Sequence, residues 1–183
     1  MCTAALGRAH ASLAPQLPMK HTEEAWESRL ADLWRRLDEM PATEFVGNMR
    51  HLTAERPEGD PIGLFELGAA YDSTGSPSTA VSLYESALQA GLTGVRRRRA
   101  RIQMASSLRN LGMPQQAVDM LVDELNQPSD ELDQAVAAFL ALALADLGRE
   151  RDALSISLEA LSRYLPRYNR SLARYAAALK STS

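Results

Sequence analysis

The sequence predicts an all-α fold, a stack of helical hairpins, and three observations support this prediction. Three glycines recur 37 and 36 residues apart along the chain: Gly75, Gly112 and Gly148. An alanine follows each of these glycines after an interval of five residues: Ala80, Ala117 and Ala153. Between the glycines, apolar residues recur at helical spacing. A period of 20–50 residues is typical of stacked helical units that cannot bury their apolar faces alone.

The first 21 residues differ from the rest of the chain. They contain Gly7, Pro15 and Pro18 and show no sustained helical period. They also lack the basic start and dense apolar middle of a secretory signal. We interpret residues 1–21 as a disordered tail, or as an upstream extension of a protein whose natural start is Met19.

Residues 22–57 are predicted to form an N-terminal helix pair that acts as a cap or a degenerate repeat. Thr22 is a plausible N-cap for the first helix. One apolar stripe at helical spacing follows it: Trp26, Leu30, Leu33, Trp34 and Leu37. The stripe predicts that both tryptophans pack in the core. Pro41 separates this helix from a second one, whose buried side comprises Phe45, Val46, Met49 and Leu52.

Three hairpins are predicted over residues 61–166. Their helices are expected at residues 62–72 and 78–90, 95–111 and 114–126, and 131–147 and 150–165. Pro128 and Pro166 mark the ends of the second and third hairpins, because proline cannot continue a helix. A C-terminal capping helix is predicted over residues 168–181.

Composition limits the classes of function. A net charge of -3 and a pI near 5.7 argue against a chain-wide affinity for nucleic acid. The lone cysteine, Cys2, excludes an intramolecular disulfide and a multi-cysteine zinc site, so we expect a reducing cytoplasm. No apolar run is long enough to span a membrane. The arginine- and alanine-rich usage favours a bacterial source.

Aligned on the glycines, the first unit matches a known repeat pattern: Leu64, Leu67, Gly68, Tyr71, Gly75, Ala80, Tyr84 and Ala87. It resembles the tetratricopeptide repeat, and the other two units match in part. The resemblance extends over about residues 22–180. It implies a right-handed all-α solenoid that makes protein–protein contacts, often with itself, and that is not an enzyme.

The resemblance also implies that the first helix of each hairpin lines a concave groove. The partner-binding candidates on that face are Phe65, Ala69, Asp72, Arg99, Ile102, Arg109, Asn110 and Leu142. Chaperone-binding relatives clamp a peptide carboxylate with Lys and Asn on this face. Phe65 and Ala69 stand at those positions in the first unit, so we do not expect that clamp. We expect instead an apolar groove floor, which either the tail or terminal helix of the same chain or a second copy would cover. Of these two coverings, our hypothesis is the second copy, in a homodimer.

The run from Arg96 to Arg101 is the most conspicuous charged segment. One interpretation is a solvated or partner-facing basic surface, with the Arg101 stem packed across the hairpin. The alternative is a nucleic-acid-binding or regulatory adaptor that uses this run. Nucleic acid is the less favoured partner, because the chain is acidic and no aromatic residue interrupts the run.

Candidate catalytic and metal-binding groups are sparse. His51 and Glu55 share a helix face, but two ligands do not make a zinc site. No nucleophile triad, phosphate loop or dinucleotide motif is present. The sequence therefore predicts no catalytic residues, no metal and no cofactor. An enzyme built from dispersed groove residues is the competing class.

Overall fold

A computed structural model describes the chain over residues 19–180, and the predictions made for residues 1–18 lie outside that range. Across the described residues every regular element is helical. The nine α-helices are α1 Met19–Arg35, α2 Ala42–Thr53, α3 Pro61–Ser73, α4 Pro77–Gln89, α5 Gly94–Asn110, α6 Pro114–Leu125, α7 Asp133–Asp146, α8 Glu150–Ser162 and α9 Asn169–Ala177. A short 3-10 turn, Leu37–Glu39, joins α1 to α2.

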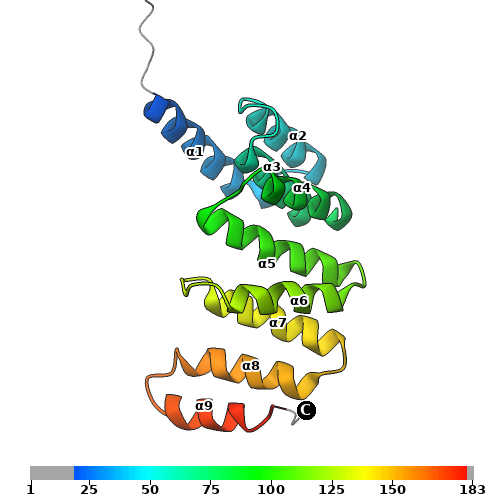
Figure 1. Ribbon diagram of the computed structural model, residues 1–183. Coiled ribbons are helices and arrows are strands. Elements are labelled where there is room, and N and C mark those ends of the chain that lie inside the picture. Colours follow the sequence, from blue (N-terminus) through cyan, green and yellow to red (C-terminus); the bar gives the residue numbers. More distant parts are fainter. Residues whose placement is uncertain (1–18, 181–183) are drawn as a thin grey trace, which may run out of the picture.

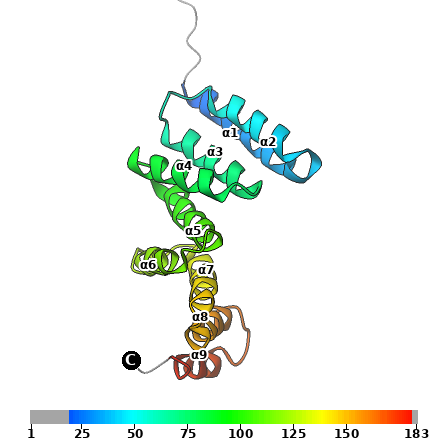
Figure 2. The ribbon, with the colours of Figure 1, turned by 90° about the vertical axis from the view of Figure 1, so that its right-hand side faces the viewer.

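The helices form one elongated stack, with α1 and α2 at one end and α9 at the other (Figure 1). Each helix packs against the next one along the chain, and the first helices of successive hairpins also touch, α3 with α5 and α5 with α7. A view from the side shows the same order of layers (Figure 2). This is a helical-hairpin solenoid, which confirms the predicted fold class.

The predicted helix boundaries agree with the structure to within a few residues, and the differences have local causes. The first helix begins at Met19, three residues before the expected N-cap at Thr22. The α8 helix ends at Ser162 although its predicted end is residue 165. After Ser162 the α-helical hydrogen bonds give way to tighter turns with bonds between residues three apart. In one of them the Tyr164 N–H donates to the Leu161 carbonyl at 3.0 Å.

The hairpin turns depend on the repeated glycines. Gly75, Gly112 and Gly148 have φ values of 82°, 78° and 71°, a left-handed conformation that residues with a Cβ rarely adopt. The turns therefore recur at the spacing of the glycines.

The first hairpin also begins at a helix cap. The Asp60 carboxylate accepts a hydrogen bond from the Gly63 N–H at 2.8 Å and caps α3.

Small residues occupy the places where the two helices of a hairpin cross. Ala80, Ala117 and Ala153 are buried. Gly68 meets the Tyr84 ring so closely that an added Cβ would lie 3.0 Å from Tyr84 Cδ1. The three alanines are buried as the alignment predicts, and in the first hairpin the Gly68 contact shows how closely α3 approaches α4.

The N-terminal helix pair has its own apolar cluster. Trp26 is buried, and its Nε1–H donates to the Leu52 carbonyl at 2.9 Å. The rings of Trp34 and Phe45 lie 5.2 Å apart. Both tryptophans therefore pack against α2 and the first repeat, as predicted.

At the other end of the stack, the Ser155 hydroxyl of α8 donates to the Ala176 carbonyl of α9 at 2.7 Å.

Candidate interaction surface

Three of the eight candidate groove residues lie inside the stack. Phe65 and Ala69 have no exposed surface, and Ile102 is 5% exposed. All three belong to the core cluster that the hairpin helices share, and the Arg99 guanidinium lies 5.3 Å from the centre of the Phe65 ring. The apolar groove floor expected at these positions is thus part of the core in the described chain.

The other five candidates reach the surface at least in part: Asp72, Arg99, Arg109, Asn110 and Leu142. They lie on α3, α5 and α7, and we call the side of the stack formed by the exposed residues of these helices the first-helix face. Several of these side chains connect one hairpin to the next, so their positions are fixed. Whether they bind a partner stays a prediction.

Asp72 is the most constrained of the five. Its carboxylate accepts hydrogen bonds from the Ser107 hydroxyl of α5 at 2.5 Å and from the Tyr84 hydroxyl of α4 at 3.4 Å. Burial raises the pKa of the Asp72 carboxyl, and these two hydrogen bonds only partly oppose that effect. Burial and the neighbouring Asp72 charge also raise the pKa of Tyr84. Asp72 therefore joins three helices rather than standing free for a ligand.

The α7 helix contributes the apolar part of the first-helix face. Ala138, Leu142 and Ala145 recur at i, i+4 and i+7 and are all exposed, with Leu142 at 46%. An ion pair between Arg109 of α5 and Asp146 of α7 closes one end of this uncharged strip. The strip offers Leu142 as its one large apolar side chain.

The arginine run has a different role from the one predicted. Arg96 donates to Glu66 at 2.9 Å and to Glu27 at 2.6 Å, and the Glu66 side chain is only 2% exposed. Glu66 also accepts from the Trp34 Nε1–H at 3.0 Å. Arg96 therefore joins α1, α3 and α5 in a network that is largely hidden from solvent.

The next arginines bind acids of the second and third hairpins. Arg97 and Arg101 both contact Glu124, a fully buried carboxylate on α6, at 2.9 and 3.0 Å. Arg98 is 4% exposed and pairs with Asp130 at 2.6 Å and Asp133 at 2.7 Å. The interpretation of this run as a solvated basic surface is wrong, because of its five arginines only Arg99 is exposed and without a carboxylate in the described chain. The nucleic-acid alternative is weakened for the same reason, because four of the five arginines pair with carboxylates of the chain itself.

The described residues offer neither a metal-binding cluster nor a membrane-spanning helix. Within residues 19–180, no group of three or more His, Cys, Asp or Glu side chains could hold a metal ion. Glu55, the neighbour of His51, is bound by Arg29. None of the described helices combines the length and apolarity needed to cross a membrane.

Successive helical hairpins, left-handed glycine turns 37 and 36 residues apart and a buried alanine five residues after each turn glycine define a helical-repeat solenoid. A family profile described as tetratrico peptide repeat matches residues 61–179, and the chain belongs to this family. The match covers the three hairpins and α9, and it leaves α1 and α2 outside. Comparisons with curated proteins and with solved structures found no match.

Proposed function

We propose that this protein is a non-catalytic protein-interaction module that self-associates and offers its first-helix face to a protein ligand. Tetratrico peptide repeats generally mediate protein–protein interactions, and a rigid stack of hairpins holds many side chains at fixed spacing. A reducing cytoplasm is the compartment we propose, since Cys2 is the one cysteine in the sequence.

The observation that supports this function best is the distribution of exposed apolar side chains. Among the side chains that the structure describes, the large apolar ones that are exposed all lie between Val95 and Tyr175. Apolar surface that gathers on one part of a molecule commonly marks a protein interface. In contrast, none of the large apolar side chains that the structure describes before Val95 is exposed.

Self-association is tested by sedimentation velocity over a wide range of protein concentrations. We expect the weight-average sedimentation coefficient to rise with concentration. A single monomeric species at the highest concentration would remove self-association from the proposal.

The first-helix face needs a separate test. A photo-crosslinking amino acid at position 142 should trap a defined protein in cells of the source organism, and the same amino acid at position 122 serves as the control. Val122 is 43% exposed, almost as much as Leu142, but it lies on α6, a second helix. Equal adducts at both positions, or none at position 142, would contradict this assignment.

A further inference from the structure

The last helices leave an apolar face uncovered. Four leucines recur along α8 and its final turns at i, i+4, i+7 and i+11: Leu154, Leu158, Leu161 and Leu165. Leu154 and Leu161 are 50% and 49% exposed, so no described residue covers them fully. The other sides of α8 are occupied, because Ala153 belongs to the core of the repeats and Ser155 bonds to α9. This leucine row is an unpartnered helix face at the end of the stack.

Three Arg-Tyr dipeptides lie between the end of α8 and the end of α9: Arg163-Tyr164, Arg167-Tyr168 and Arg174-Tyr175. Their tyrosines are 69%, 77% and 61% exposed, more than any other large apolar side chain in the described chain. Tyr168 has a φ of 65°, a left-handed conformation that is costly for a bulky residue. Tyrosine and arginine are the residue types that dominate binding energy at protein interfaces.

This end of the stack is strongly basic. Residues 160–180 contain four arginines and one lysine and no acidic residue. Lys180 lies 3.6 Å from Glu159. In the described chain, none of the four arginines meets a carboxylate: Arg163, Arg167, Arg170 and Arg174. We call the leucine row, the three tyrosines and these four arginines the basic end.

The opposite end of the stack is formed by α1 and α2 (Figure 1), and its sequence is acidic. Residues 22–60 contain ten acidic residues and five arginines. Four of those arginines already pair with acids of the same segment: Arg29, Arg35, Arg36 and Arg56. Four exposed carboxylates have no basic partner among the described residues: Glu24, Asp38, Glu44 and Glu58. We call these four carboxylates the acidic end.

We propose that the basic end of one copy binds the acidic end of a second copy, head to tail. Two basic ends would repel each other, so charge disfavours a two-fold dimer through this face and favours the opposite end of another molecule. Such a contact does not close on itself between two molecules, and it yields a short filament or a ring. This inference depends on the proposed self-association and specifies which surfaces make it.

A single-stranded nucleic acid could use the same arginines and tyrosines for phosphate and base contacts. It would not use the exposed leucines of α8, and it would leave the acidic end without a role. A second copy uses the arginines and tyrosines of the basic end and gives the acidic end a role.

Charge reversal tests the contact directly. Variant A carries Arg163→Glu, Arg167→Glu and Arg170→Glu, which makes both ends acidic. Variant B carries Glu24→Lys, Glu44→Lys and Glu58→Lys, which makes both ends basic. In sedimentation velocity we expect each variant alone to associate more than a hundredfold more weakly than wild type, because opposed like charges cost several kcal/mol. An equimolar mixture of A and B should associate again.

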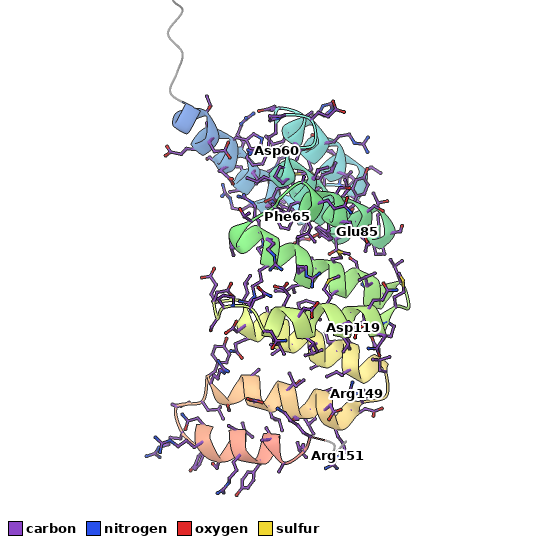
Figure 3. The ribbon with its side chains drawn as sticks, viewed as in Figure 1. Asp60, Phe65, Glu85, Asp119, Arg149 and Arg151 are labelled. Atoms are coloured by element: carbon purple, nitrogen blue, oxygen red, sulfur yellow. The ribbon has the colours of Figure 1, made fainter. Side chains whose placement is uncertain are left out.

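A matched control separates this effect from net charge. Glu85→Lys, Asp119→Lys and Glu131→Lys make the same change in charge as variant B, and Glu85 and Asp119 lie on the middle helices α4 and α6 (Figure 3). This control should associate like wild type. Leu154→Ser with Leu161→Ser should weaken association at least tenfold. Circular dichroism checks that every variant keeps the wild-type helix content.

The outcomes are distinct. If wild type self-associates and A or B alone does so equally well, or their mixture stays monomeric, the head-to-tail contact is wrong and self-association stands. If wild type is monomeric at every concentration, the head-to-tail contact and the proposed self-association both fall. If wild type stays monomeric but binds a labelled oligo-uridine and variant A does not, the basic end serves nucleic acid instead.

Discussion

Arg101 Nε lies 3.0 Å from Glu124 Oε1, and the Glu124 side chain has no exposed surface. At the positions of these two residues, the first hairpin has Leu64 and Ala87. The second hairpin therefore replaces an apolar pair by a charged pair at one place in its interior. A buried carboxylate is tolerated there because Arg97 and Arg101 both donate hydrogen bonds to it.

Removing the buried carboxylate should destabilise the fold strongly. Glu124→Ala leaves the two arginines without their acid, and we expect a loss of about 3–5 kcal/mol in the free energy of unfolding, measured by urea denaturation. Asp123→Ala is the control, since Asp123 is exposed and lies 3.5 Å from Arg101; it should change stability by less than about 1 kcal/mol. Arg101→Leu with Glu124→Ala should lose less than Glu124→Ala alone. Equal stability of Glu124→Ala and wild type would show that the pair contributes nothing.

Two glycines inside helices should respond in opposite directions to alanine. A Cβ at Gly68 would lie 3.0 Å from the Tyr84 ring and 3.2 Å from Leu83 Cβ, and the buried ring cannot move aside. We expect Gly68→Ala to cost about 1–3 kcal/mol. A Cβ at Gly47 of α2 would meet nothing within 4 Å, so Gly47→Ala should stabilise by about 0.5–1 kcal/mol. Thermal unfolding of the two variants checks the signs, and a stabilised Gly68→Ala would contradict the close packing.

The alanine that follows each turn glycine should tolerate no larger side chain. Ala117 is fully buried and Ala153 is 7% exposed, both where two helices cross. We expect Ala117→Leu and Ala153→Leu each to cost about 1–3 kcal/mol by overpacking. Gln116→Leu places the same side chain on the exposed side of α6 and should leave the melting temperature nearly unchanged. Wild-type melting of the two alanine variants would show that the crossing has room to spare.

Asp72 and Asp60 should give opposite pH dependences. The pKa of Asp72 is raised by burial, so the folded chain holds its proton more tightly than the unfolded chain does. Its contribution to stability is therefore lost as pH rises from the usual aspartate pKa of about 3.9 through the raised value. Asp72→Asn should become more stable relative to wild type over that rise, as measured by urea unfolding at several pH values.

For Asp60, burial alone would raise the pKa, but hydrogen bonds from Arg56 and the Gly63 N–H outweigh it and lower the pKa. Its stabilising contribution is present above the unfolded pKa of about 3.9 and is lost as pH falls through the lower folded value. Asp60→Asn should therefore lose stability relative to wild type as pH rises through this window. Parallel pH profiles for the Asp60 and Asp72 variants would contradict the two pKa shifts.

The candidate site was harder to predict than the fold. The alignment correctly assigned Phe65, Ala69 and Ile102 to the first helices of their hairpins, but it did not predict how closely α5 packs on α3. One signal in the sequence pointed to the buried charges: Arg101 and Glu124 both depart from the repeat pattern in the same hairpin. Such paired departures indicate compensation, because neither charge is stable there without the other.

By itself, the sequence determined the hairpins, their spacing and their turns. These features follow from local chemistry, since a left-handed glycine, a proline or a helical apolar stripe acts within a few residues of its own position. Only the tertiary structure decided the role of the arginines, because Arg96 and Glu27 are 69 residues apart and meet through the stacking of three helices. No pattern in the sequence links Arg96 to Glu27. Its surface or interior role is set by the distances that folding creates.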